Sequence, residues 1–534
     1  MYFLTLLTVA FAWIHKEASI KGYNDVTCCY GHYDVKINQT GWNELVVVSS
    51  DKCSNEDQAF CIGYFEGLAT AEDIDIAWNN YRFNHWIDGE PPSDIKVLMR
   101  KQHNFWEKRT FDETWRRQYI IKNQFEGLYE GYRDAGGNMT MDDMYIWYNS
   151  GDLYDINDFA DYSVNSPSAM RERYGRMNIH SCSAFIKNFN DTVYFAHNTW
   201  DHYAEMFRVY KVYETHFGEK RTIAMTSYPG IFASIDDFYS VRTELSTYFV
   251  TETTNNVYDV QIYEGVVNRL LYQQRIMQAL LFETSVKGMA ESVCTLNSGT
   301  YNNQWMFFDA GRWKSGERTE ILYITETMPG LCKTHDVTSS LTEGNKYWVS
   351  YNVPYDREIY NKSGLEEYLR GINCDAYTMA RRRQIFDRDM HNVVDLESAK
   401  DLIRSNDFEK DPLATYTSEC KYDFNSTEEK NPCYAISARK DLDEEHFELY
   451  GAKDAKVMST ENLDVMHIIN GPTYDVQPVF DFTEIEGYEF YVEGIPMRYD
   501  FDWMEVETIR KSINGASVII VNNLIAMLFA VLFL

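Results

Sequence analysis

The chain is poor in cysteine and proline, and each deficit excludes a class of protein. Its 534 residues include 10 Cys and 11 Pro. So few cysteines cannot form the dense framework of a small disulfide scaffold, and no Cys-x-x-Cys pair points to a structural zinc site. The scarcity of proline argues against a long proline-rich linker. No internal repeat or low-complexity segment interrupts the chain.

Basic side chains are also few, at 50 Lys and Arg against 81 Asp and Glu, which gives a formal net charge of −31. Such a surface repels phosphate backbones, so we expect no nucleic-acid partner. Hydrophobic residues make up 45% of the chain and aromatic residues 15%. This composition predicts a large ordered core and argues against disorder.

Both ends of the chain are apolar. Residues 1–18 read as a signal peptide without a basic start. The apolar tail at 512–534 follows small residues, which is typical of a lipid-anchor signal, while a retained membrane anchor explains it equally well. We therefore expect passage through the secretory pathway, with membrane contact through the tail left open.

Export also predicts glycosylation and disulfide formation. The chain holds five Asn-x-Ser/Thr sequons, at Asn38, Asn138, Asn190, Asn361 and Asn425. Spacing in polar stretches predicts two local disulfide loops, Cys53–Cys61 and Cys420–Cys433. The sequence leaves open the partners of the remaining cysteines apart from Cys182, namely Cys28, Cys29, Cys294, Cys332 and Cys374.

Hydrophobic periodicity changes along the chain. It is mostly helical over 62–148, with Asp94 and Thr140 as predicted helix N-caps, and residues 149–176 read as a polar linker. After Cys182 strands predominate, mixed with helices expected at 203–213 and 266–282. Strands and helices without a βαβ rhythm predict an α+β fold.

The most informative stretch is an alternating strand that opens at Cys182 and returns through Thr192–His197. If a symmetric turn spans Asn188–Asp191, then Ala184 pairs with Phe195 and Cys182 pairs with His197. The predicted hairpin therefore carries the sequon Asn190 at its tip and the thiol at its open end.

Two activation routes suit a nucleophilic cysteine here. His197 could act as general base, or cleavage of the Ser181–Cys182 bond could free an α-amine that takes the thiol proton. A buried, inert cysteine in a strand is the commoner arrangement and stays open. His197 and His202 do not complete a metal-ligand set, so we expect no metal and no other cofactor.

Ordered motifs between about residues 60 and 505 resemble the phospholipase B-like family. They include the segments 180–184 (His-Ser-Cys-Ser-Ala), 197–200 (His-Asn-Thr-Trp), 227–230 (Ser-Tyr-Pro-Gly), 236–239 (Asp-Asp-Phe-Tyr), 252–255 (Glu-Thr-Thr-Asn), 298–305, 348–352, 382–386 and 431–433. The resemblance implies an N-terminal-nucleophile hydrolase with an αββα sandwich of two antiparallel sheets between helical layers.

The resemblance also implies self-cleavage before the cysteine. A mostly helical N-terminal chain, 19–181, would then stay associated with a catalytic chain, 182–511. Residue by residue, it implies Cys182 as nucleophile, His197 and Trp200 in the His-Asn-Thr-Trp motif, Asn352 in the oxyanion hole and Arg382 beside the nucleophile. The three arginines at 381–383 leave the register of the last residue open.

The function expected from this resemblance is hydrolysis of acyl bonds, with release of fatty acids from phospholipids, in a lysosome-like compartment or outside the cell. An amidase acting on lipid-like or peptide-like amides, and a non-catalytic lumenal or surface glycoprotein, are the alternatives. For work at acid pH, we expect Arg382 and burial to depress the pKa of the new α-amine.

Overall fold

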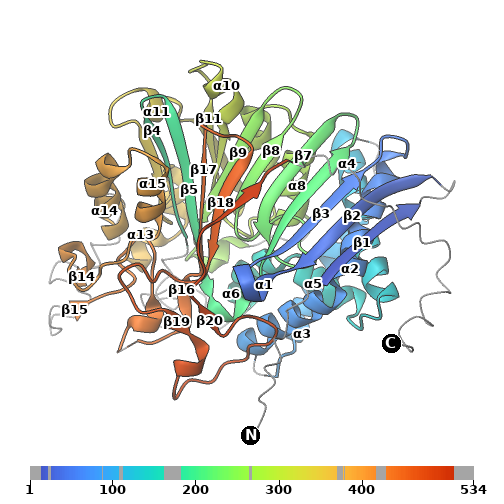
Figure 1. Cartoon of the computed structure of the whole chain (residues 1–534), viewed down its shortest axis with the longest axis horizontal. Helices are drawn as coiled ribbons and strands as arrows, with labels where there is room; N and C mark the ends of the chain where they lie inside the picture. The colour runs from blue at the N-terminus through green and yellow to red at the C-terminus, as the bar shows by residue number, and fades with distance from the viewer. Residues whose placement is uncertain are drawn as a thin grey trace, which may run out of the picture.

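Two large β-sheets pack face to face in the computed structural model of the protein (Figure 1). The structure describes residues 14–21, 26–86, 88–107, 112–160, 182–263, 268–369, 377, 379–416, 429–444 and 446–509. Strands and helices alternate without a regular βαβ order. The predicted α+β class is therefore confirmed.

The larger sheet has ten strands and combines β1–β3, from before Cys182, with β6–β12, from after it. All its neighbours are antiparallel except the parallel pair β3–β6. In spatial order the strands are β1 (Ile14–Lys21), β2 (Thr27–Val35), β3 (Asn43–Ser49), β6 (Val209–His216), β7 (Lys220–Ser227), β8 (Phe238–Arg242), β9 (Thr247–Thr254), β10 (Asn303–Asp309), β11 (Leu322–Met328) and β12 (Leu331–Asp336).

The smaller sheet has seven antiparallel strands, and the second strand of its main path begins at Cys182. Its main path is β13 (Tyr347–Ser350), β4 (Cys182–Phe189), β5 (Thr192–His202), β17 (Asp454–Ser459), β18 (Val465–Asn470) and β21 (Met504–Glu507), with β16 (Tyr450–Ala452) paired to β5. Two short hairpins lie outside these sheets, β14 (Thr415–Tyr416) with β15 (Glu429–Lys430), and β19 (Phe480–Asp481) with β20 (Arg498–Tyr499).

Helices cover the outer face of each sheet. The larger sheet is covered by α2 (Asn55–His85), α3 (Ser93–Trp106), α4 (Glu113–Asp134), α5 (Met141–Tyr148), α6 (Ser150–Ala160), α8 (Tyr272–Phe282) and α9 (Val286–Ser292). The smaller sheet is covered by α14 (Arg381–Asp389) and α15 (Leu396–Ile403). Short helices occupy the connections, namely α1 (Ile37–Thr40), α10 (Ala310–Lys314), α11 (Ser339–Thr342), α12 (Arg357–Lys362) and α13 (Leu365–Tyr368).

Three apolar layers fill the spaces between these elements, and one of them lies between the larger sheet and the helices that cover it. Ile186, Phe195 and Phe249 belong to the layer between the two sheets. Phe185 and Phe386 belong to the layer beneath α14 and α15. Successive residues of β4 thus point to opposite faces, as the strand period requires, so both faces of this strand are buried.

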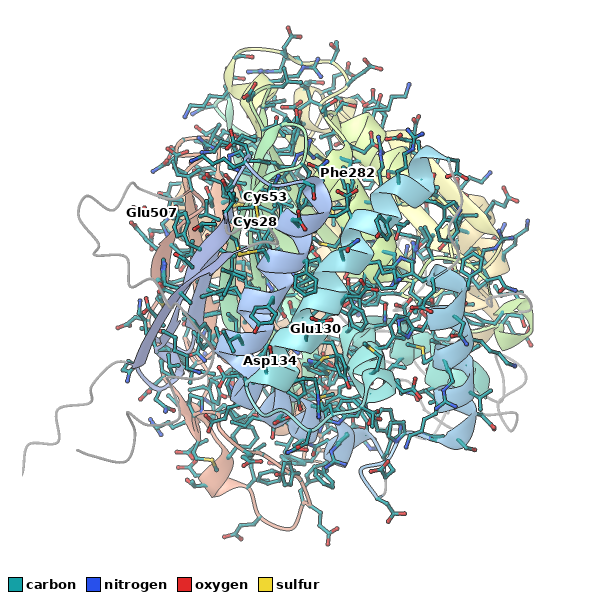
Figure 2. All side chains as sticks on the ribbon, turned by 90° about the vertical axis from the view of Figure 1, so that its right-hand side faces the viewer. Cys28, Cys53, Glu130, Asp134, Phe282 and Glu507 are labelled. Carbon is teal, nitrogen blue, oxygen red and sulfur yellow. A yellow bond between two sulfur atoms is a disulfide. The ribbon has the colours of Figure 1, made fainter. Side chains whose placement is uncertain are left out.

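Helices α2 and α4 lie side by side across one face of the molecule (Figure 2). Each helix brings two glycines to the contact, Gly63 and Gly67 from α2 and Gly127 and Gly131 from α4. A Cβ atom added to Gly127 would lie 2.1 Å from the backbone oxygen of Phe60. Only glycine permits this backbone approach.

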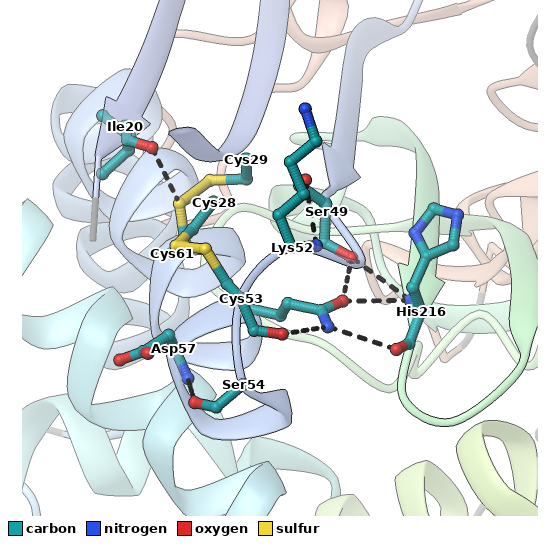
Figure 3. The surroundings of a disulfide bond; sticks show 12 residues. Ile20, Cys28, Cys29, Ser49, Lys52, Cys53, Ser54, Asp57, Cys61 and His216 are labelled. Atoms are coloured by element: carbon teal, nitrogen blue, oxygen red, sulfur yellow. Dashed lines mark hydrogen bonds between the residues drawn. A yellow bond between two sulfur atoms is a disulfide. The ribbon is translucent and has the colours of Figure 1, made fainter. Parts of the chain in front are cut away.

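Three disulfides are formed among the described residues. Cys28 pairs with Cys53 and Cys29 with Cys61 (Figure 3), and a third bond joins Cys294 to Cys332. The predicted Cys53–Cys61 loop is therefore wrong, because β2 presents two adjacent cysteines to the start of α2 and each takes one partner.

Cys433 is a buried free thiol in the structure. This argues against its predicted pairing with Cys420, a residue outside the described ranges.

The segment before Cys182 is built into the fold and is not an appendage. It supplies β1–β3 to the larger sheet. The carboxylate of Glu66 on α2 accepts a hydrogen bond from Lys211 Nζ on β6 at 2.7 Å, with both side chains fully buried. On α6, Tyr154 donates to Asp201 at 2.6 Å. Strand pairing and buried polar contacts thus join the two parts of the chain.

Several local predictions differ from the structure. The expected helix at 203–213 is instead a short turn followed by β6. The expected linker contains α6, and the N-cap of α3 is Pro92, which places Asp94 in its first turn. Thr140 caps α5 as predicted.

The ends of the chain fall mostly outside the described residues. The predicted boundary after residue 18 cuts through β1, which begins at Ile14. The apolar tail at 512–534 lies outside those residues. Within the described part of the chain, no helix is both long and apolar enough to cross a bilayer.

Replacing Gly127 by alanine should lower the free energy of unfolding by about 1–3 kcal/mol, because the new methyl group would push α2 and α4 apart. Urea titration of the purified chain measures this. The control is Gly288→Ala on α9, where the nearest atom, at 2.8 Å, is the movable end of the Glu283 side chain. Equal stabilities of the two variants would contradict the close-packing argument.

Candidate functional site

Cys182 is the first residue of β4 and pairs across the hairpin with Thr199. His197 pairs with Ala184 instead, so the predicted Cys182–His197 pairing is wrong by two residues. The physical reason lies in the turn. Asn190 and Asp191 adopt left-handed φ values of 49° and 66°, which make a tight two-residue hairpin turn where a wider loop was expected.

The backbone of Cys182 is held on both sides. Its N–H donates to Asn352 Oδ1 at 3.3 Å, and its carbonyl oxygen accepts from Arg382 Nη1 at 2.5 Å. Arg382 Nη2 also donates to Asn352 Oδ1 at 2.5 Å. Cys182, Asn352 and Arg382 are each 3% exposed. Two side chains distant in sequence thus converge on the backbone of one residue.

The fold explains how these two side chains reach Cys182. Asn352 follows β13, the neighbour of β4, and its φ of 67° is left-handed. Its Nδ2 group donates to the Thr254 carbonyl at 2.7 Å, which fixes Oδ1 toward Cys182. Arg382 is the second residue of α14 and also donates to the Tyr351 carbonyl at 2.8 Å. The expected oxyanion role of Asn352 would use this same Nδ2 group and remains a prediction.

The contacts of the arginine run differ from one residue to the next. Arg382 reaches Cys182, while Arg383 pairs with Asp387 one helical turn later at 2.8 Å. The Arg382 guanidinium also lies 4.4 Å from the centre of the Trp200 ring. Trp200 Nε1 donates to Asn198 Oδ1 at 2.8 Å. Trp200 therefore packs against the arginine in a fixed orientation, and its expected place in a substrate pocket remains a prediction.

The thiol of Cys182 is protonated in this environment. Burial raises the pKa of Cys182 to about 12, with the charge of Asp237 raising it further and that of Lys456 opposing. Burial and the Lys456 charge hold the pKa of His197 well below its ordinary value. A lowered pKa makes His197 a weak proton acceptor, and His197 lies opposite Ala184 and not opposite Cys182. Its expected role as general base remains a prediction.

A network of buried charges lies beside the hairpin, and the sequence did not reveal it. Lys456 Nζ contacts Asp454 Oδ1 at 2.7 Å and Thr199 Oγ1 at 2.6 Å. Arg208 pairs with both Asp236 and Asp454. Burial alone would raise the pKa of Asp454, but Lys456 and Arg208 hold it below its ordinary value. The network joins β5, β17 and the residue before β6, and it contacts Thr199, which pairs with Cys182.

A cavity of about 250 Å³ lies next to this site. Its lining combines aromatic, aliphatic and polar side chains with one cation, namely Gln304, Ser340, Tyr347, Trp348, Val349, Tyr351, Val353, Pro354, Tyr355, Tyr377 and Arg383. The site and the cavity meet at Tyr351, whose carbonyl accepts from Arg382. An apolar chain with a polar end matches this lining.

The remaining predicted residues are located as follows. Asn38, Asn138, Asn190 and Asn361 are exposed, as glycosylation requires, and Asn425 lies outside the described residues, as does Ser181. In the described part of the chain, no group of three or more His, Cys, Asp and Glu side chains is arranged to hold a metal ion.

Comparison with known proteins places this chain in a family. The Phospholipase B family profile matches residues 29–506. The chain belongs to the Phospholipase B family. The expected resemblance is therefore confirmed.

The relatives span most of the chain. It is 32% identical to Phospholipase B of Crotalus adamanteus, with 93% of this chain and 92% of the relative covered. It is 30% identical to Phospholipase B-like protein D of Dictyostelium discoideum, with 91% and 88% covered. Phospholipase B-like 1 of Homo sapiens is 30% identical, with 90% and 87% covered.

Replacing Arg382 by lysine should destabilise the chain by about 1–3 kcal/mol, because a single ammonium group cannot satisfy the Cys182, Tyr351 and Asn352 oxygens together. Denaturant titration provides the measurement. Arg383→Lys is the matched control, since its exposed ion pair with Asp387 should change stability by under about 1 kcal/mol. Similar losses in the two variants would contradict the assigned contacts.

Proposed function

We propose that this chain is a hydrolase that releases fatty acids from phospholipids, with Cys182 as the nucleophile after cleavage of the Ser181–Cys182 bond. The observation that carries the proposal is the pair of contacts from Asn352 to the Cys182 nitrogen and from Arg382 to its carbonyl oxygen. A merely structural cysteine in a strand needs no side chains devoted to its peptide groups. An N-terminal nucleophile needs both its amine and its carbonyl held.

The overall architecture supports this class of mechanism. Two stacked sheets between helical layers, antiparallel except for the pair β3–β6, resemble the αββα sandwich expected of N-terminal-nucleophile hydrolases. The contacts of Glu66 and Tyr154 with the later part of the chain would keep 19–181 associated with 182–511 after cleavage. In the proposed enzyme, the N-terminal fragment is thus a permanent partner.

The site residues divide the work in the proposed reaction. After cleavage, the new α-amine of Cys182 remains within reach of Asn352 Oδ1 and takes the thiol proton. The thiolate attacks the acyl carbon of the ester and forms a thioester, and the departing alcohol receives the proton. Water then hydrolyses the thioester and restores the thiol. Arg382 holds Asn352 and the Cys182 carbonyl in place, and its charge disfavours protonation of the amine.

The substrate class follows from the family and from the cavity. The relatives bear phospholipase B names, and the aromatic cavity beside Tyr351 suits an acyl chain. Arg383, which lines the same cavity, offers a positive charge to a phosphate group. Three disulfides and four exposed sequons support the secretory pathway as the place of action.

Replacing Cys182 by alanine should abolish both cleavage of the chain and release of fatty acid from phosphatidylcholine vesicles, because no nucleophile remains. Denaturing electrophoresis and a fatty-acid assay measure the two effects. Cys433→Ala is the matched control, since Cys433 is the other buried free thiol of the described residues, and it should keep both activities. Fatty-acid release by purified Cys182→Ala would contradict the proposal. If the wild-type chain released fatty acid only from a fatty-acyl amide, this would favour an amidase.

A further inference from the structure

The first cleavage of the chain poses a problem that the mature enzyme does not have. Before cleavage, the Cys182 nitrogen is an amide that donates its hydrogen to Asn352, so it cannot accept the thiol proton. His197 lies opposite Ala184, and burial lowers its pKa, which makes it a weak proton acceptor. This step therefore needs another proton acceptor near Cys182.

A pair of buried carboxyl groups lies at the same end of the sheets. Asp237 immediately precedes β8, and Glu252 lies near the end of β9 beside it, since Phe238 pairs with Thr251. Both side chains are fully buried. The hydroxyl group of Tyr301 donates to Asp237 Oδ2 and lies 3.4 Å from Glu252 Oε1. One phenol thus serves one oxygen of each acid.

The other oxygen of each acid has no donor. Asp237 Oδ1 and Glu252 Oε2 are buried, and no N–H or O–H group donates to either oxygen. The two carboxyl groups lie close enough to share a hydrogen bond. Two carboxylates cannot do this without a proton, and two buried negative charges this close repel strongly. The arrangement requires at least one proton held between them.

We propose that Asp237 and Glu252 form a proton-sharing carboxyl pair that accepts the Cys182 thiol proton during the first, self-processing cleavage. This proposal rests on the proposed function, because it concerns how the Cys182 nucleophile is set free. With one shared proton the pair carries a single negative charge. It can take up a second proton and become neutral as the thiolate forms.

The cleavage step needs no reactant other than the chain itself and water. The S–H bond breaks and its proton moves to the pair, and the thiolate forms a C–S bond with the Ser181 carbonyl carbon. The C–N bond to Cys182 then breaks, and the pair returns a proton to the departing nitrogen. Water hydrolyses the thioester, which leaves a Ser181 carboxyl group and a free Cys182 thiol and amine.

Electrostatic coupling supports this role. The charge on Asp237 raises the pKa of Cys182, and the charge on Cys182 raises the pKa of Glu252. Burial raises the pKa of Asp237 to about 7 and that of Glu252 well above its ordinary value. The titratable and charged groups facing the pair are Cys182, His197, Asp236, Lys456 and the phenols of Tyr239, Tyr272 and Tyr301.

The sign of the pH dependence follows from the shared proton. Below the pKa of Asp237, near 7, both acids are protonated and cannot accept another proton. Above that pKa the singly protonated pair is present and can act. Cleavage of the purified single chain should therefore accelerate as pH rises through about 7 and then level off.

The test follows the rate of two-fragment formation between pH 5 and 8.5 on electrophoresis. Asp237→Asn and Glu252→Gln should slow cleavage about 100-fold, as loss of a general base does, and remove the rise near pH 7. Asp309→Asn is the matched control, since this buried acid at the far end of β10 also has a raised pKa. It should cleave like the wild type.

Tyr301→Phe provides a second test, because it removes the hydroxyl group and keeps the shape of the side chain. The hydroxyl group of Tyr301 lowers the pKa of Asp237 by hydrogen bonding. Its removal should therefore move the midpoint of the rise in cleavage rate to higher pH. Wild-type rates with an unchanged pH profile in all three variants would overturn the carboxyl pair and leave the proposed nucleophile standing. If Asp237→Asn and Glu252→Gln fail to fold, an unmoved midpoint in Tyr301→Phe overturns it alone. A wild-type chain that never cleaves would instead overturn the proposed function.

Discussion

The site depends on one constraint, the fixation of the Cys182 backbone at the start of β4. Asn352 and Arg382 hold its nitrogen and its carbonyl oxygen, and they also bind each other. Because β4 is hydrogen-bonded to β5 on one side and β13 on the other, the peptide cannot rotate away. A rigid strand end with both polar groups occupied suits a residue whose backbone takes part in chemistry.

This fixation is supported by an unusually polar layer between the sheets. Charges such as Arg208, Asp236, Asp454 and Lys456 are fully buried, and burial of an unpaired charge would cost several kcal/mol. Each of these four contacts at least one opposite charge. Such a network contributes little net stability, but it fixes the side chains around Thr199, the residue that faces Cys182.

Sequence patterns predicted the α+β class, the helical character of 62–148 and the strands around Cys182, because period and turn residues are local signals. The hairpin register was missed by two residues because the turn at Asn190 and Asp191 is tighter than its composition implies. Asn352 and Arg382 came from the family resemblance, since no spacing rule brings together residues 170 or more positions apart. Asp237 and Glu252 lie in two motifs of the family resemblance, 236–239 and 252–255. Their proposed shared proton depends on packing that only the structure reveals.

The central claim is that Cys182 becomes the N-terminus of the catalytic chain. Mass spectrometry of the mature protein under reducing conditions tests this most directly, because it gives the first residue of each fragment. The account predicts a larger fragment that begins at Cys182 and a smaller one that ends at Ser181. A mature protein with an unbroken bond between Ser181 and Cys182, or a larger fragment that begins at another residue, would contradict it.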